Sequence, residues 1–432
     1  MSGRRLPPAY PLRGQLNDEV HARPPEPLIA PARLSYLALL CDRAQRDESA
    51  SMIAQFARDH DVKPPAEGGS HLRVDLGTFR LRWERHSEFV RYTFIVPGGP
   101  DGPAPFGSTA LDAVAPDWIA ALPGELLVAA HVLLLPHREG PHEPPEIADT
   151  MFSGTLLVGA AVSDGAANAY TDFRLHPDGF SRLLIHDRAS TPWQAGRIAQ
   201  RLLEIETYRM LALLTLPVAR ALAPELDVQE RELAAITAAL VEAGEADEPA
   251  LLERLTRLAA AIDSRNARTQ FRFSAAAAYD DLVRRRIGEL REGRIHGVQT
   301  FREFTERRLA PAMATCRAMA ARQLALSEHV ARATQLLSTR VDVTREQQTH
   351  ALLEQMNRRV KLQLRLQSTV EGLSVAAITY YVVSLIGHLA EGLEQSGIPV
   401  RPPIAMAVAI PVVAGLMALG LRRVHHMVKG LD

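Results

Sequence analysis

Three histidines close together in the chain could bind a metal ion. His131, His137 and His142 occupy one short stretch, and Glu143 follows the last of them. Imidazole nitrogens and carboxylate oxygens are ligands that divalent transition metals accept. The five-residue spacing from His137 to His142, however, crosses a proline-broken loop, PHREGPHEPPE, which fixes no geometry. Solvated loop residues are the favoured interpretation, and the sequence leaves open which metal, if any, is bound.

A second group of ionisable residues lies in the proline-rich segment 1–31. The run LNDEVHARPPEPL places Glu19, His21 and Arg23 at alternate positions, so in an extended strand all three side chains point to one face. Such a group could bind an anion or help to close an interface. We favour the alternative that this is an ordered arm whose charges pair with the domain it crosses.

A third pattern, a row of small or hydroxyl residues, follows one face of an apolar segment near the carboxyl end. Its members are Thr369, Gly372, Ala376, Thr379, Val383 and Gly387. Glu371 stands at one end of the row, and Glu391 and Glu394 stand at the other. If several copies surrounded a pore, the row would line it and the carboxylates would attract cations. Close packing of helices in a membrane also explains small residues, and it is favoured by this pattern alone.

Two apolar segments that include this row predict a transmembrane hairpin over residues 372–421. There are 19 uncharged residues between Glu371 and Glu391, and 20 between Arg401 and Arg422. About 20 residues of helix cover the ~30 Å hydrocarbon core of a bilayer. A hydrophobic hairpin in a soluble core is the alternative, but two such segments follow each other in a chain whose other helices are heavily charged.

Basic residues predict how the hairpin is oriented. The connecting loop contains Arg401 alone, whereas seven basic residues flank the hairpin: Arg358, Arg359, Lys361, Arg365, Arg422, Arg423 and Lys429. Because positive residues stay in the cytoplasm, both termini are expected there. The first residues contain no apolar run that could act as a secretory signal. We therefore expect a protein of the bacterial inner (cytoplasmic) membrane, with the lipid bilayer as a partner.

Residues 1–191 are expected to form a cytoplasmic α+β domain. A helix is predicted over Arg43–Asp59, and Pro177 to Gly179 predict a tight turn. Strand-like runs rich in β-branched and aromatic residues are Ala32–Leu40, His71–Leu76, Thr78–Arg85, Glu88–Val96, Glu125–Leu135, Gly154–Val162, Asn168–His176 and Phe180–His186. These features predict an antiparallel sheet of six or seven strands with helices on one face.

From residue 192 the apolar period becomes that of helices, and residues 192–371 are expected to form a helical bundle and stalk. The first helix should end before Pro224, and others should begin near Asp227 and Glu248. A last soluble helix, Thr344 to Val370, has no breaker before the first span. The continuous rod Thr344–Ala390 would contain 47 residues, about 70 Å at the helical rise.

That rod has an apolar seam typical of a coiled coil, so we expect a homo-oligomer. The seam consists of Leu353, Met356, Val360, Leu364, Gln367 and Val370 or Glu371. After the hairpin, residues 422–432 form a basic cytoplasmic tail.

The composition and motifs exclude several classes of function. The formal net charge of −1 says nothing about a nucleic-acid partner, but the acidic residues beside each basic cluster argue against one. Two cysteines provide no disulfide framework. The sequence contains no Gly-x-x-x-x-Gly-Lys-Ser/Thr, Gly-x-Ser-x-Gly, His-Glu-x-x-His or Cys-x-x-Cys motif. We therefore predict a non-enzymatic protein without a catalytic residue or cofactor.

Three stretches carry a family resemblance: LNDEVHARPPEP, FTERRLAPAMATC, and the long run from LLSTRVDVTREQQ to YYVVSLIGHL. They resemble the bacterial family catalogued as domain of unknown function 3422, over nearly the whole chain. The resemblance implies a membrane-anchored bacterial protein and transfers no catalytic residue.

The architecture also resembles CorA-type magnesium transporters, which are pentamers with a long helix continuing into the first of two terminal spans. Those transporters carry a Gly-Met-Asn signature at the outer end of the first span, where this chain has Leu385–Leu389, LIGHL. Two hypotheses follow. The chain is either a CorA-like homo-oligomeric cation channel or transporter, or a membrane-anchored scaffold or regulatory protein with a cytoplasmic interaction domain.

Overall fold

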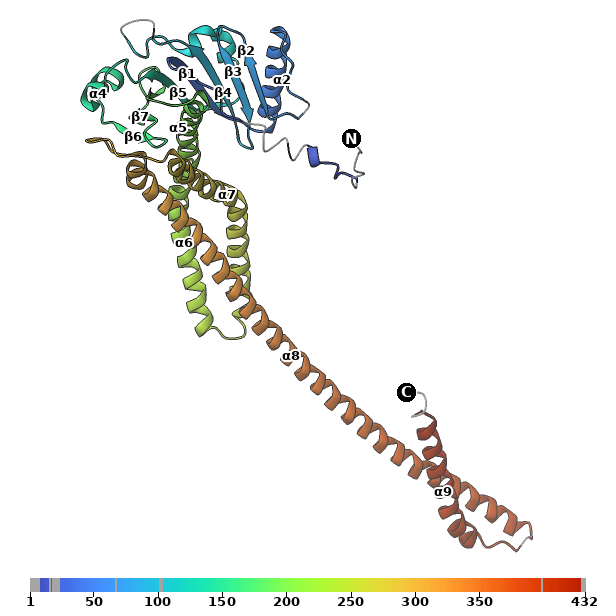
Figure 1. The fold of residues 1–432 in the computed structure, drawn as a ribbon. Helices are drawn as coiled ribbons and strands as arrows, with labels where there is room; N and C mark the ends of the chain where they lie inside the picture. The colour runs from blue at the N-terminus through green and yellow to red at the C-terminus, as the bar shows by residue number, and fades with distance from the viewer. Residues whose placement is uncertain are drawn as a thin grey trace. The chain divides into compact units, whose positions relative to one another are not determined.

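The computed structural model divides the chain into two compact units. It describes residues 8–14, 17, 24–66, 68–100, 104–397 and 399–428. The first unit combines Met1–Glu242 with Glu253–Ala333, and the second combines Ala243–Leu252 with Thr334–Asp432. A β-sheet and the helices packed on it belong to the first unit, whereas the apolar carboxyl-terminal helices belong to the second (Figure 1).

The first unit contains an eight-stranded sheet with the strand order β2, β3, β4, β1, β5, β8, β7, β6 (Figure 1). The strands are β1 (Ala32–Leu40), β2 (His71–Asp75), β3 (Arg80–Arg85), β4 (Phe89–Pro97), β5 (Glu125–Pro136), β6 (Val158–Val162), β7 (Ala167–Thr171) and β8 (Ser181–Asp187). The predicted α+β class is confirmed, and so are the predicted bounds of β1.

The sheet is mixed, rather than wholly antiparallel as expected, and it has more strands than predicted. β5 and β8 run parallel, with Ala130 opposite Ser181 and Leu135 opposite His186. Parallel neighbours need a long crossover connection. Here the connection contains α4 (Pro144–Phe152) and the antiparallel strands β6 and β7, which continue the sheet beyond β8.

Helices cover both faces of the sheet, so the expectation of helices on one face was wrong. On one face, Tyr92 and Trp83 contact Ser49 of α2 (Arg43–Asp59) through hydrogen bonds of 2.6 and 2.9 Å. On the other face, the Tyr36 hydroxyl lies 2.8 Å from Thr207 Oγ1 of α5 (Pro192–Leu213). The physical reason is that central strands such as β1 are buried almost throughout, and each face therefore needs a covering layer.

Three shorter helices lie in the connections between strands. They are the 3₁₀ helix η1 (Ala110–Ala113), α3 (Pro116–Ala120) and α4. The sequence predicted a loop where α4 begins, because Pro144 and Pro145 were interpreted as breakers. Proline is instead favourable in the first helical turn, and Ile147, Met151 and Phe152 then bury the helix against β5 and β8.

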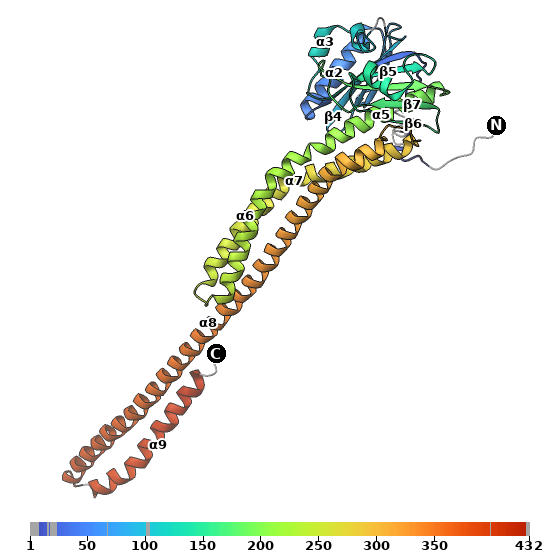
Figure 2. The same ribbon diagram turned by 90° about the vertical axis from the view of Figure 1, so that its left-hand side faces the viewer.

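Four long helices follow: α6 (Thr215–Glu242), α7 (Glu248–Leu290), α8 (Phe301–Gln395) and α9 (Pro402–Val428). In the first unit α6, α7 and α8 pack side by side (Figure 2). Arg322 of α8 contacts Glu230 of α6 at 2.6 Å, and Thr269 of α7 accepts a 3.0 Å hydrogen bond from Gln323 of α8.

Pro224 does not end a helix, contrary to the prediction. The break comes at Leu214, between α5 and α6, and Pro217 occupies the first turn of the new helix. A residue in the first turn of a helix needs no backbone N–H for the helical hydrogen bonds, whereas Pro224 leaves one such bond unformed inside α6. Burial of Leu222 and Leu226 on either side stabilises the helix through the proline.

The predicted continuity of the rod is confirmed, because Thr344–Ala390 lies within the single helix α8. The helix begins much earlier than expected, at Phe301, and passes through Pro311 without a break. Its last turns lie against α9, which runs back along it within the second unit (Figures 1 and 2).

Candidate functional site

The carboxyl-terminal hairpin is apolar and mostly uncovered. α8 and α9 each contain a segment long and apolar enough to cross a bilayer by length and composition. Only 17% of the α8 segment and 6% of the α9 segment is buried inside the structure, whereas the core helix of a soluble protein would be mostly buried. Leu373, Tyr380, Leu385 and Leu416 are among the exposed large side chains.

Two residues in the carboxyl-terminal half of the row proposed to line a pore, Val383 and Gly387, are buried. Val383 is only 6% exposed. Gly387 is buried where the helices approach most closely, since an added Cβ would lie 2.8 Å from Met406 Sδ of α9. Within one chain, small residues at these two positions are therefore explained by helix packing.

The amino-terminal half of the row is open. Thr369, Gly372 and Ala376 are exposed. Thr379 is half-buried, and its hydroxyl donates a 2.7 Å hydrogen bond to the Val375 carbonyl of its own helix. The Thr369 hydroxyl likewise donates to the Arg365 carbonyl at 2.9 Å. Neither hydroxyl needs a partner from another helix.

The three carboxylates at the ends of the row lie near the surface of the helix. Gln367 donates a 3.3 Å hydrogen bond to Glu371, one turn away. Glu391 lies 3.5 Å from His388 Nδ1, and Glu394 is exposed. Glu391 and Glu394 are exposed and Glu371 is half-buried, and the pore assignment stays a prediction.

Glu19, His21 and Arg23 lie outside the described residues, and the structure says nothing of their grouping. The neighbouring part of the same segment crosses the sheet: Glu26 is buried and lies 3.1 Å from Arg73 and 3.4 Å from Arg80. Gly196 of α5 allows this approach, because an added Cβ there would lie 1.6 Å from the Glu26 carbonyl oxygen.

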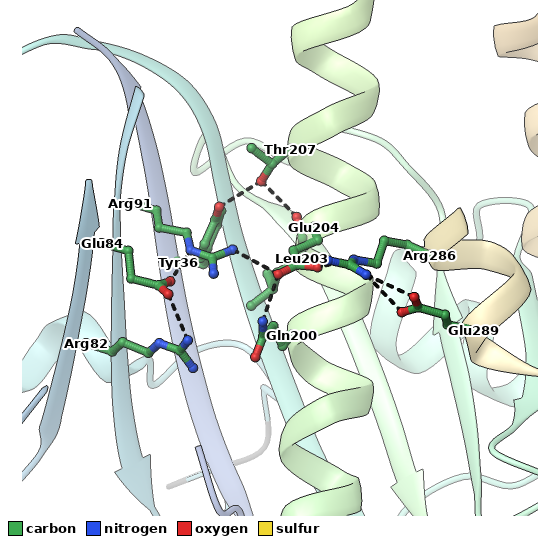
Figure 3. Close-up of polar contacts among 10 residues, drawn as sticks. All are labelled: Tyr36, Arg82, Glu84, Arg91, Gln200, Leu203, Glu204, Thr207, Arg286 and Glu289. Atoms are coloured by element: carbon green, nitrogen blue, oxygen red, sulfur yellow. Dashed lines mark hydrogen bonds and ion pairs between the residues drawn. The ribbon is translucent and has the colours of Figure 1, made fainter. Parts of the chain in front are cut away.

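A chain of buried ion pairs joins the sheet to two helices (Figure 3). Glu84 of β3 accepts hydrogen bonds from Arg82, at 2.8 Å, and from Arg91 of β4. Arg91 also donates to Glu204 of α5 at 3.3 Å, and Glu204 in turn accepts from Arg286 of α7. Glu84 and Glu204 are 1% and 3% exposed. Such a network holds four elements in a fixed relation, since no member can be moved without leaving a buried charge unpaired.

The pKa of Glu84 reflects these neighbours. Burial alone raises the pKa of this carboxyl, but the charges and hydrogen bonds of Arg91 and Arg82 outweigh burial and lower the pKa to about 2. Burial likewise lowers the pKa of Arg91, and the opposing charge of Glu84 raises it well above its usual value. Both groups are therefore ionised at neutral pH, which makes the pair a structural element and not a proton donor.

Three histidines come together at the end of the sheet, although they are not the three that lie close in sequence. The ligand nitrogens of His137, His142 and His186 all lie within 4.8 Å of one another. His131 is elsewhere, stacked on Phe180 and 2.9 Å from Ser35 Oγ. Of the three histidines in the metal hypothesis, His137 and His142 lie in this group and His131 does not. His186 of β8 is the third member instead.

Burial first, and then the neighbouring positive charges, lower the pKa values of two of these histidines. The pKa of His186 falls to about 4, and that of His137 is lowered as well. Both imidazoles are consequently neutral at neutral pH, which is the form that binds metals. Sequence reasoning missed His186 because the contact depends on the parallel pairing of β5 with β8, which places it opposite Leu135, two residues before His137.

Comparison with known proteins identifies one family. Residues 8–428 match the family described as protein of unknown function (DUF3422). No curated protein and no solved structure matches the chain, so the resemblance to CorA-type magnesium transporters is not supported. Because the match covers nearly the whole sequence, the chain belongs to the DUF3422 family.

Proposed function

We propose that this chain is a membrane-anchored protein that associates with copies of itself through α8 and carries its amino-terminal α+β domain in the cytoplasm. The main support for this proposal is the surface of α8 between Leu352 and Leu373. This part of the helix belongs to the same unbroken element as the apolar segment, and it exposes apolar side chains well before that segment begins.

The exposed side chains support self-association. Leu353, Met356, Val360 and Leu364 are each more than half exposed and follow one another at helical spacing. Burying a side chain of this size contributes about 1.5–3 kcal/mol. A second copy of α8 is the proposed occupant because it offers the same seam, and because a common membrane anchor would hold parallel copies in the same register.

The hairpin supports the anchor. Its two helices pack on each other through Gly387 and Met406, and they leave most of their apolar surface to the surroundings. In lipid this exposure is favourable, whereas in water it would drive aggregation. The basic residues on the flanks, among them Arg358 and Arg365, suit the anionic cytoplasmic leaflet.

Self-association through α8 is tested by exchanging the anchor. The hairpin, residues 372–421, is replaced with an unrelated two-span anchor, and membrane fractionation is combined with the mass of the detergent-solubilised protein. We expect the exchanged protein to stay in the membrane and to keep its oligomeric mass, because the seam precedes the hairpin. A monomeric product that remains folded would show that self-association depends on the spans themselves.

A cation channel is the second candidate, and one observation favours it. Thr369, Gly372 and Ala376 are exposed in the single chain, at the end of the row where copies of α8 could face one another. The test is ion flux in liposomes containing the oligomeric protein. Flux that falls on replacing Ala376 with leucine would support a pore, and the absence of flux under every cation gradient would leave only the anchor.

A further inference from the structure

We propose that His137, His142 and His186 bind a divalent transition metal ion of the zinc class and leave one coordination position open to solvent. The site lies in the α+β domain and is independent of membrane anchoring and self-association. It would give the cytoplasmic domain a ligand of its own.

Two neighbouring strands position the first two ligands. His186 belongs to β8 and is 1% exposed. Its Nε2 atom is buried and has no hydrogen-bond partner among the described residues. His137 directly follows β5, and its backbone N–H donates a 2.7 Å hydrogen bond to the Asp187 carbonyl, which holds it beside His186. Its Nδ1 is also buried without a partner. Leaving such buried atoms without a partner is unfavourable, and a bound metal ion would satisfy them.

The third ligand arrives on a loop that folds back over the first two. His142 is exposed, and its ring centroid lies 5.0 Å from that of His137 and 5.9 Å from that of His186. Gly140, with φ of +83°, lies between His137 and His142 in a backbone conformation that favours glycine. An added Cβ at Gly140 would lie 3.8 Å from His186 Nε2, so glycine leaves space beside that nitrogen.

The distances suit a site that closes on its ion. Nitrogen ligands at about 2.0–2.1 Å from tetrahedral zinc lie about 3.3 Å from one another. The observed limit of 4.8 Å requires the rings to approach, and the exposed loop with His142 can provide that movement while β5 and β8 stay fixed. An accessible side then remains for a water molecule as fourth ligand.

The ligand set selects the class of metal. Three imidazoles suit zinc, copper, nickel and iron, whereas Mg²⁺ and Ca²⁺ require oxygen ligands. The charges nearby are mixed: Arg188 is close enough to lower the pKa of His137, and Glu143 adjoins His142. Imidazole ligands bring no negative charge of their own, so three of them with this balance favour a divalent ion over a more highly charged one.

The test measures metal binding by the full-length protein in detergent, with Zn²⁺ for stoichiometry and Co²⁺ for a spectroscopic signature. We expect one Zn²⁺ per chain, and visible absorption of tetrahedral Co²⁺ that Zn²⁺ abolishes. His142→Ala should weaken binding at least about 10–100-fold, because losing a ligand costs no less than losing an outer-shell partner. Its exposed position should leave the fold intact, which circular dichroism verifies.

His137→Ala serves as the second variant, and His296→Ala as the matched control, since His296 is an exposed loop histidine in the same unit. The control should bind Zn²⁺ like the unaltered chain. Substoichiometric Zn²⁺ in the unaltered chain would overturn the proposal. So would equal affinity in the folded His142→Ala protein and the control, because the three rings would then be a packing cluster only.

Discussion

Glu84 illustrates how single buried charges fix the α+β domain. Replacing it with glutamine leaves Arg91, which is buried, and Arg82 without their shared counter-charge. Removing one partner of a buried pair costs about 3–5 kcal/mol. We therefore expect Glu84→Gln to lower the free energy of unfolding by roughly that amount. Tryptophan fluorescence during denaturation should report it directly, since Trp83 is the buried neighbour of Glu84.

Glu253→Gln is the matched control, because Glu253 and Arg257 form an exposed pair at 3.4 Å and should contribute little. Equal effects of the two substitutions would contradict the importance of the buried network.

The same carboxylate predicts a dependence of stability on pH. Its pKa is about 2 in the folded chain, below the usual 4.5 of a glutamate. Its contribution is therefore complete above pH 4.5 and is lost as the pH falls toward 2. Denaturation between these limits should show a falling free energy of unfolding in the unaltered chain, and a smaller fall in Glu84→Gln. Parallel curves for the two proteins would show that Glu84 does not titrate in this range.

Gly196 tests how the segment around Glu26 is held. A methyl group there would collide with backbone, which cannot rotate away as a side chain can. We expect Gly196→Ala to destabilise the domain by about 1–3 kcal/mol, measured by thermal unfolding. Gly288→Ala, in an open position of α7, should be neutral or stabilising by up to about 1 kcal/mol. If Gly196→Ala behaves like Gly288→Ala, the segment is not packed on α5 in solution.

Individual residues were only partly predictable from the sequence. Charged and apolar residues alternate along β3, RLRWER, which indicates a strand with two unlike faces. The sequence could not tell that the charged face is buried, because that depends on Glu204 and Arg286 arriving from distant helices. For the same reason, the sequence did not show that His186 belongs to the histidine cluster, because its place there depends on the pairing of β5 with β8.

At the scale of elements, the exposed seam of α8 makes a prediction about self-association. Met356→Glu combined with Val360→Glu introduces two carboxylates into the seam, and like charges between copies would repel each other. We expect the oligomeric mass in detergent to fall toward that of the monomer. Gln348→Glu with Gln355→Glu adds the same charge outside the seam and should leave the mass unchanged.

A stable oligomer of the Met356 and Val360 variant would show that the seam is not the contact. Loss of the oligomer in both double variants would indicate a general effect of charge near the membrane, and would equally count against the seam.

Elements with a clear period were predicted well. β1 and α2 have the expected bounds, because a short apolar run and the amphipathic period of a helix are local signals. Two prolines led to wrong predictions. Pro224 was expected to end a helix but lies inside α6, and Pro144 was expected in a loop but begins α4. Whether a proline ends a helix depends on its position in the turn and on the packing around it, and the second of these is tertiary information.

At the scale of the whole molecule, the chain belongs to a family whose match extends over both compact units. The α+β domain and the apolar hairpin thus both lie within the residues that match the family. The proposed anchor explains why a domain with a well-packed core is joined to helices whose apolar surface is mostly uncovered.

The location of the hairpin loop relative to the bilayer tests this proposal most directly. Single cysteines replace Ser396, in the loop, and Gln348, on α8, and a membrane-impermeant maleimide is applied to right-side-out and inside-out vesicles. The two native cysteines, Cys41 and Cys316, are buried and should react little. We predict that Ser396→Cys is labelled only in right-side-out vesicles and Gln348→Cys only in inside-out vesicles. Labelling of both positions from the same side would contradict a membrane-spanning hairpin.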